Sequence, residues 1–278
     1  MAKTKERTLS VVIFIYIICF ILRFLEYFLL RTDETFWGEA FIHKLLGIAI
    51  LFAALKIYGF RPAAIGFAKK GILRSLAEGV AFGLIVFVPA YLTEIIITAM
   101  QGNFETLAVY VSAYSVNGTI GKQTDLLFFL ICVAGNIINV IMEEGLFRGF
   151  FQKMLERKHA FLPSATIASS LFGLWHIMAP VRSYCDGTMS RSGFIANALL
   201  LVTTSALIGF KFALMTRLTD SLYMAMGHHF INNALVNMLH VVSGTGIDSL
   251  MVVRISIAQS ISFVIVWIWY MRARRKSD

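Results

Sequence analysis

Charged residues are scarce in this chain. They make up 15% of its 278 residues, whereas hydrophobic residues make up 58%, and the mean hydropathy is +0.75. A typical soluble domain carries about 25% charged residues. This composition therefore excludes an ordinary soluble domain and indicates a polytopic membrane protein.

Paired cysteines are also missing. The three cysteines, Cys19, Cys132 and Cys185, have no CxxC spacing, so neither a disulfide framework nor a thiolate metal site is indicated. The net charge of +9 raises the question of nucleic acid, but the basic residues fall in short clusters between apolar runs and form no nucleic-acid-binding module. Orientation in a membrane explains these charges better, and we expect no nucleic-acid partner.

The chain contains several long apolar runs. A membrane-spanning helix needs about 20 mostly apolar residues. No internal repeat or linker interrupts the runs, so we predict a single all-α transmembrane domain over residues 1–278 with about eight transmembrane helices. The predicted spans are 9–31, 41–58, 75–100, 126–152, 161–179, 194–216, 221–242 and 250–271.

The loop charges predict an orientation. Eight spans place both termini on one side of the membrane. Most Lys and Arg residues in the loops and near the span ends fall on that side, and Lys211 near the end of the sixth span is counted with them. By the positive-inside rule both termini are expected in the cytoplasm. Short loops and the absence of a sorting signal favour the plasma (inner) membrane of a prokaryote. The polar stretch 101–125 is expected to be an external loop.

Two features predict how other spans pack. Arg23 and Glu26 lie three residues apart on one face of the first span, which favours a mutual ion pair. Gly79 and Gly83 form a GxxxG spacing in the third span, which allows a second helix to approach closely.

Two adjacent carboxylates in the fourth span are the most informative residues of the chain. In an α-helix Glu144 and Arg148 lie on one face and can pair, whereas Glu143 points about 100° away. Ionisable groups in hydrocarbon are costly unless they are paired or face a wet cavity, so they indicate a functional site. A structural ion pair between packed helices is the alternative. Gly145 and Gly149 would admit a neighbouring helix beside the pair.

Histidine and asparagine residues in two later spans complete a candidate catalytic set. His176 lies one turn after Phe172, whose ring can pack against the imidazole. In the seventh span two pairs are spaced i,i+4: His229 with Asn233, and His228 with Asn232. At a rise of about 1.5 Å per residue, the active-site candidates of the three spans have compatible depths in the membrane.

These residue types suit the hydrolysis of an amide bond. The reaction needs a base for water, a proton donor for the leaving nitrogen and dipoles aimed at the oxyanion. A carboxylate, two imidazoles and an amide group supply them. The same Glu143, His176 and His229 could instead bind zinc as a His2Glu set. The chain lacks the HExxH spacing of zinc peptidases, so we expect no metal and no other cofactor, with zinc as the alternative.

The ordered motifs resemble the CPBP (CAAX protease and bacteriocin-processing, or Abi) family of intramembrane glutamic endopeptidases. The resemblance rests on Glu143-Glu144-x-x-x-Arg148, Phe172-x-x-x-His176 and His229-x-x-x-Asn233, each on a separate apolar helix. The motif-bearing core is about 126–242. Ser221-Leu222, with a histidine eight residues after the serine, favours His229 and Asn233 over His228 and Asn232 as the family's motif.

The resemblance implies an endopeptidase that hydrolyses membrane proteins or membrane-anchored peptides near the cytoplasmic face of the bilayer. It implies that Glu143 and His176 activate water in a buried catalytic cavity and that His229 and Asn233 stabilise the oxyanion. The residues in supporting roles are Glu144, Arg148, Phe172, His228 and Asn232. A non-proteolytic membrane scaffold or regulator, such as an immunity protein or a transporter partner, is the alternative function.

Overall fold

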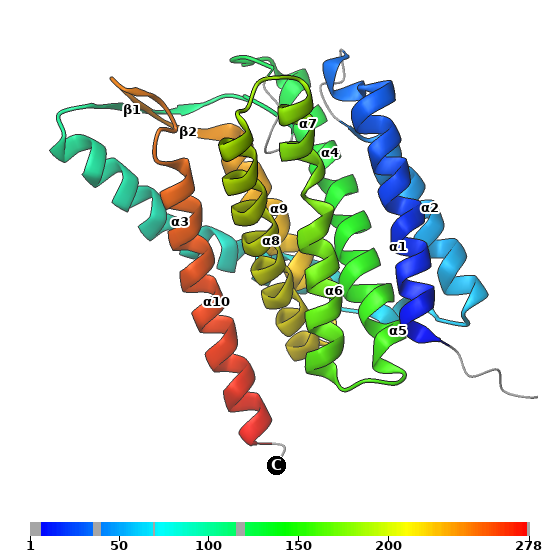
Figure 1. Cartoon of the computed structure of the whole chain (residues 1–278). Coiled ribbons are helices and arrows are strands. Elements are labelled where there is room, and N and C mark those ends of the chain that lie inside the picture. The colour runs from blue at the N-terminus through cyan, green and yellow to red at the C-terminus, as the bar shows by residue number, and fades with distance from the viewer. Residues whose placement is uncertain (1–6, 36–39, 69, 115–119, 277–278) are drawn as a thin grey trace, which may run out of the picture. The chain divides into compact units, whose positions relative to one another are not determined.

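A computed structural model describes residues 7–35, 40–68, 70–114 and 120–276 (Figure 1). The α-helices are α1 (Thr8–Leu25), α2 (Ile42–Ile57), α3 (Ile72–Met100), α4 (Leu126–Glu143), α5 (Gln152–Glu156), α6 (Phe161–Trp175), α7 (Met178–Cys185), α8 (Arg191–Thr219), α9 (Tyr223–Met238) and α10 (Met251–Arg275). The π-helices are η1 (Glu26–Leu30) and η4 (Glu144–Phe151), and the 3-10 turns are η2 (Thr32–Glu34) and η3 (Pro62–Ile65). The strands are β1 (Phe104–Val109), β2 (Leu239–Ser243) and β3 (Gly246–Ile247).

The protein is an all-α polytopic membrane protein, as its composition predicts. Among the described residues, 6 helical segments are long and apolar enough to cross a membrane. The eight predicted spans are not all confirmed, because α2 and α9 have only 16 residues each. At about 1.5 Å per residue such a helix is roughly 24 Å long, shorter than the ~30 Å hydrocarbon core. The six segments are Thr8–Leu30, Ile72–Met100, Leu126–Glu156, Phe161–Cys185, Arg191–Thr219 and Met251–Arg275.

The chain forms two compact units. The first contains α1, η1, α2, η3, η4 and α5 to α8, together with the last residues of α4 from Ile141. The second contains α3, β1, α4 up to Val140, α9, β2, β3 and α10. Within the first unit α6 and α8 run side by side (Figure 1).

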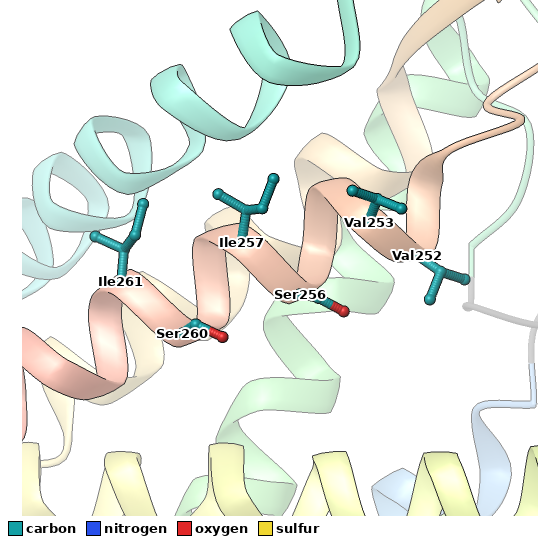
Figure 2. A pocket seen from close by; sticks show the side chains of 6 residues that line it. All are labelled: Val252, Val253, Ser256, Ile257, Ser260 and Ile261. Carbon is teal, nitrogen blue, oxygen red and sulfur yellow. The ribbon is translucent and has the colours of Figure 1, made fainter. Parts of the chain in front are cut away.

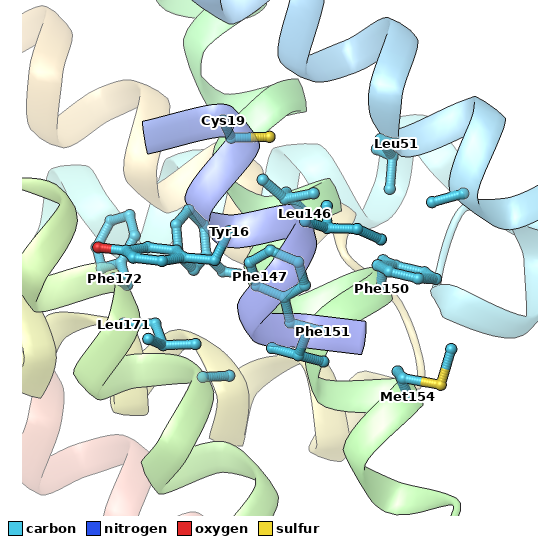
Figure 3. Packing of buried hydrophobic residues seen from close by; sticks show 14 of the residues in the cluster. Tyr16, Cys19, Leu51, Leu146, Phe147, Phe150, Phe151, Met154, Leu171 and Phe172 are labelled. Carbon is cyan, nitrogen blue, oxygen red and sulfur yellow. The ribbon is translucent and has the colours of Figure 1, made fainter. Parts of the chain in front are cut away.

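An aromatic core fills the first unit. Phe147 and Phe151 of η4 pack edge to face against Tyr16 of α1, and Phe172 of α6 packs edge to face against Phe147. Figure 3 shows these rings together with the aliphatic side chains around them. Edge-to-face ring pairs prefer one geometry, so this core fixes how η4 sits against α1 and α6.

The polar residues of α1 are arranged differently from the prediction. Arg23 and Glu26 do not pair directly, because His43 of α2 lies between them. Its Nδ1 is 2.6 Å from Glu26 Oε2, and its Nε2 is 3.4 Å from Arg23 Nη1. The change to a π-helix at Glu26 alters the spacing on which the predicted i,i+3 pair depends.

Glycines bring α3 and α9 of the second unit into close contact, as the Gly79-x-x-x-Gly83 spacing predicts. A Cβ on Gly79 would lie 2.1 Å from the Met224 carbonyl oxygen, and a Cβ on Gly227 would lie 2.4 Å from the Leu76 carbonyl oxygen. Only glycine, which has no side chain, allows the two helix backbones to come this close. The two backbones therefore touch just before the histidines of α9.

A small antiparallel sheet in the order β1-β2-β3 belongs to the second unit. Phe104 pairs with Ser243 and Val109 with Leu239 at the two ends of the β1–β2 ladder. The sequence assigns 101–125 to a loop and the start of β2 to the seventh span, and both assignments are wrong where the strands form. The run Leu239–Ser243 is apolar enough to continue a helix, but its pairing with β1 makes it a strand.

A shallow groove follows one face of α10 (Figure 2). None of the predicted site residues lines it. Its lining is mostly apolar and consists of Val252, Val253, Ser256, Ile257, Ser260 and Ile261.

Candidate active site

The acidic pair lies where the helix changes type. Glu143 is the last residue of α4, and Glu144 is the first residue of the π-helix η4. In a π-helix the hydrogen bonds join residues five apart, and such wide turns are frequent at functional sites. The prediction of a continuous α-helix is therefore wrong over Glu144–Phe151, because the apolar pattern of the sequence does not distinguish the two helix types.

The predicted pair of Glu144 and Arg148 is confirmed. Arg148 Nη1 lies 3.3 Å from Glu144 Oε1, and the two side chains are 1% and 0% exposed. A buried charge without a partner is costly. The pair therefore compensates each of the two buried groups for part of the hydration that it loses.

Arg148 is held by two further helices of the first unit. Its Nε donates to the Gly209 carbonyl oxygen of α8 at 3.2 Å. Its guanidinium lies 3.9 Å from the ring centroid of Phe172 in α6, a cation–π distance. A Cβ on Gly209 would be 2.5 Å from Arg148 Nη2, so a glycine at 209 is what admits the guanidinium.

Lys211 is a further functional candidate, which the sequence motifs do not include. The residue is 0% exposed in α8, and its charge interacts with those of Glu144 and Arg148. Its assignment to a cytoplasmic loop is wrong, because α8 continues to Thr219. The signal in the sequence is a lysine inside the apolar run of the sixth span. An ionisable residue in such a run indicates a functional site, as it does for Glu143.

His176 directly follows the last residue of α6, and its ring has a fixed orientation. Its ring packs edge to face against Phe172 with 4.7 Å between the centroids, which confirms the predicted contact. Its Nδ1 lies 2.8 Å from the Phe172 carbonyl oxygen. A carbonyl oxygen only accepts, so Nδ1 carries a proton, and in the neutral imidazole Nε2 is the acceptor.

Glu143 has a different kind of partner from Glu144. The side chain is 2% exposed, and its Oε1 accepts a hydrogen bond from the indole Nε1 of Trp175 at 3.2 Å. Trp175 precedes His176 and was not singled out from the sequence, where a tryptophan in an apolar helix is typical of packing. The two carboxylates thus differ in a hydrogen-bond partner: Arg148 donates to Glu144 and the Trp175 indole donates to Glu143, while the charges of Arg148 and Glu143 also interact.

The remaining predicted residues lie on α9 in the second unit. His228 is 0% exposed and packs against Phe82 of α3, with 5.2 Å between the ring centroids. His229 follows it on a different face of the helix and is 7% exposed. The side chain of His228 is therefore occupied by the contact between α9 and α3.

The two asparagines of α9 form a hydrogen-bonded chain. Asn232 Oδ1 accepts from Gln259 Nε2 of α10 at 2.7 Å, and Asn232 Nδ2 donates to Asn233 Oδ1 at 3.1 Å. Asn233 thereby uses its oxygen as an acceptor. The orientation directs its NH2 group away from Asn232, so that group can serve as a donor.

The first unit thus brings together the residues of two predicted motifs: Glu143, Glu144, Arg148, Phe172 and His176. The second unit carries the third motif, namely His228, His229, Asn232 and Asn233. That the two sets meet in one site stays a prediction.

Within the described residues, no group of three His, Cys, Asp or Glu side chains has a metal-binding arrangement. The zinc set of Glu143, His176 and His229 needs residues of both units. It stays an alternative for experiment to test.

A protein-family model matches part of the chain. Residues 125–235 match the sequence model of the family described as Type II CAAX prenyl endopeptidase Rce1-like. The matched segment contains every predicted site residue and nearly coincides with the predicted core at 126–242. No curated protein sequence matches the chain. The resemblance stated from the motifs is confirmed by this match.

Proposed function

We propose that the chain is an intramembrane endopeptidase acting on membrane proteins or membrane-anchored peptides near the cytoplasmic face, and the match of residues 125–235 to the Rce1-like type II CAAX prenyl endopeptidase family model supports this proposal. The observation that carries the proposal is the set of hydrogen bonds made by two adjacent buried carboxylates. Glu144 pairs with Arg148, whereas Glu143 accepts a hydrogen bond from neutral Trp175. This hydrogen bond joins Glu143 to the residue that precedes His176, so Glu143 is the carboxylate to which we assign the proton exchange.

In the proposed reaction Glu143 takes a proton from water while the water oxygen attacks the scissile carbonyl carbon. His176 Nε2 accepts a hydrogen bond from the same water. The carbonyl oxygen becomes an oxyanion, to which His229 and the NH2 group of Asn233 donate. The carbon–nitrogen bond then breaks, and the proton on Glu143 passes to the leaving nitrogen. The products are a carboxylic acid and an amine.

The neighbours of α9 support the choice of His229 and Asn233 over the preceding pair. His228 packs against Phe82, and Asn232 is engaged by Gln259. We assign His228 and Asn232 to holding α9 in place. Exchange of His229 for alanine should then abolish turnover, whereas exchange of His228 for asparagine should mainly lower thermal stability.

The experiment is a comparison of membrane peptides in cells that express the wild type or Glu143→Gln. The matched control is Glu78→Gln, which neutralises a carboxylate on the exposed side of α3. We expect new carboxyl termini from membrane proteins with the wild type and the control but not with Glu143→Gln. Identical peptides in all three samples, together with full complementation by a folded Glu143→Gln protein, would support the non-proteolytic scaffold instead.

We propose that the reaction uses no metal, and the zinc alternative makes a distinct prediction. The purified chain is assayed on a prenylated CAAX peptide before and after treatment with a chelator. A metal-free mechanism keeps its rate. A zinc-dependent mechanism loses the rate and regains it when zinc is added back.

A further inference from the structure

Trp175 is in direct contact with the proposed general base. Its indole Nε1 donates to Glu143 Oε1 at 3.2 Å, and its side chain is 0% exposed. Hydrogen bonds to charged groups are stronger than those between neutral groups. The bond occupies one carboxylate oxygen and restricts how the carboxylate can turn.

The indole is held on several sides by other rings of the first unit. The ring centroids of Tyr16, Phe147 and His43 lie 6.4, 5.8 and 5.7 Å from that of Trp175. These residues come from α1, η4 and α2. A side chain packed against three elements cannot change rotamer without disturbing the core, so the direction of its N–H is set by the fold.

A buried cation lies on the same indole. The Arg23 guanidinium carbon is 4.6 Å from the Trp175 ring centroid and 4.8 Å from that of Tyr27. A cation at this distance is attracted to the electron-rich face of the ring. It draws electron density from the indole and makes the N–H a better hydrogen-bond donor toward Glu143.

Arg23 is itself fixed from α2. An arginine only donates, so His43 Nε2 accepts from Arg23 Nη1 at 3.4 Å, and His43 Nδ1 donates to Glu26 Oε2 at 2.6 Å. Glu26 also accepts from the backbone N–H groups of Ile42 and His43. A chain of contacts therefore runs from Glu26 through His43, Arg23 and Trp175 to Glu143.

We propose that Trp175 is a positioning residue for Glu143, and that Arg23 strengthens it by lying on the indole. The inference rests on the proposed role of Glu143 as the general base. Trp175 does not touch substrate in this role: it orients the carboxylate that does. The effect of its loss should then fall on the chemical step and not on substrate binding.

Trp175→Phe removes the N–H donor while keeping an aromatic ring in the core. We expect kcat on a prenylated CAAX peptide to fall roughly 10- to 100-fold, which corresponds to the free energy of one hydrogen bond to a charged group. KM should stay unchanged within about twofold. The matched control is Trp267→Phe, the same exchange at a partly exposed residue of α10.

A second measurement needs no substrate and does not depend on the folding of Trp175→Phe. The full chain in nanodiscs is labelled with 15N at its tryptophans, and the indole signals are recorded in the wild type and in Glu143→Gln. The Trp175 signal is assigned from Trp175→Phe, or by elimination with Trp→Phe exchanges at the other three tryptophans. We expect this signal to move in Glu143→Gln, because an amide oxygen is a weaker acceptor, while those of Trp267 and Trp269 stay in place.

The two readouts separate the possible failures. An unmoved Trp175 signal in Glu143→Gln, or an unchanged kcat in a folded Trp175→Phe, would overturn the positioning role. A moved signal together with full activity of Glu143→Gln would show that the contact exists but that Glu143 is not the base, which overturns the proposed function.

Discussion

At the scale of single residues, two neighbouring carboxylates acquire different properties from their partners. Glu144 lies against Arg148, with Lys211 close enough for its charge to act on both. Glu143 lies against Trp175. The ion pair with Arg148 thus balances the charge of Glu144, and the hydrogen bond from Trp175 orients Glu143.

Arg148→Met tests the balance. The exchange leaves Glu144 buried opposite an apolar side chain, and breaking a buried pair in this way costs about 3–5 kcal/mol. We expect a clear fall in the midpoint of thermal unfolding in detergent. Arg74→Met is the matched control, because Arg74 and Glu78 have the same i,i+4 spacing but an 86% exposed arginine. Equal effects of the two exchanges would contradict the account of the buried pair.

The residue-scale contacts were predictable only where both partners lie on one helix. Glu144 with Arg148 and Phe172 with His176 follow from the i,i+4 spacing, which survives small changes of helix type. The contact between Trp175 and Glu143 joins α6 to α4, and no spacing in the sequence encodes it. Lys211 is visible in the sequence as a charge in an apolar run, but its place near the end of a predicted span suggests a loop residue instead.

At the scale of helices, glycines decide which elements touch. A Cβ on Gly79 would meet the backbone of α9, whereas a Cβ on Gly145 would lie 2.6 Å from Leu51 Cδ2, the end of a flexible side chain. Side-chain ends can rotate away, but a backbone cannot move without shifting its helix.

Gly79→Ala should therefore destabilise the protein more than Gly145→Ala. We expect a loss of about 1–3 kcal/mol or more for the exchange in α3, the range for overpacking a tight contact, and a smaller loss for the exchange in η4. Thermal unfolding of both variants in the same detergent measures the order. The reverse order would contradict the close contact between α3 and α9.

The small sheet is anchored by a second cluster of charges in its own unit. His240 Nδ1 lies 2.6 Å from Asp248 Oδ2, and Arg254 Nη1 donates to Asp248 Oδ1 at 2.9 Å and to Glu94 Oε2 at 2.6 Å. Burial raises the pKa of Asp248, but the hydrogen bond from His240 and the charge of Arg254 outweigh it and hold the pKa below its ordinary value of 3.8. The carboxylate form is thus favoured by folding.

The sign of the pH dependence follows from this lowered pKa. A group whose pKa is lower in the folded state stabilises the fold at pH values above its pKa in the unfolded state. This contribution is lost as the pH falls below about 4 and through the pKa of the folded state. We expect the unfolding midpoint of the wild type to drop between pH 6 and pH 3 by more than that of Asp248→Asn. An identical drop in both would mean that Asp248 does not contribute through its ionisation.

At the scale of the whole molecule, composition is enough to predict the class of protein. The number of spans depends on the lengths of the helices, and the strands depend on pairing between distant segments. Fifteen per cent charged residues were enough to predict a polytopic helical membrane protein. The number of spans was harder to predict, because α2 and α9 are apolar but short. The strands were not predictable, since Leu239–Ser243 is apolar in either conformation and pairs with a segment some 130 residues away.

We propose that both termini lie in the cytoplasm of a prokaryote, in its plasma membrane. A fluorescent protein fused after residue 276 should then be fluorescent, because it folds poorly after export, whereas alkaline phosphatase inserted at Gly187, in the turn after α7, should be active. Inactive phosphatase at that turn and active phosphatase at the C-terminus would reverse the orientation.

The central claim is that Glu143 is the general base of an intramembrane peptidase. The most direct measurement is kcat of the purified chain, reconstituted in lipid with a prenylated CAAX peptide or a membrane protein identified in cells. General-base catalysis is worth roughly 100- to 10,000-fold, so Glu143→Gln should lose at least 100-fold while Glu78→Gln keeps the wild-type rate. Cleavage by folded Glu143→Gln at the wild-type rate would contradict the account.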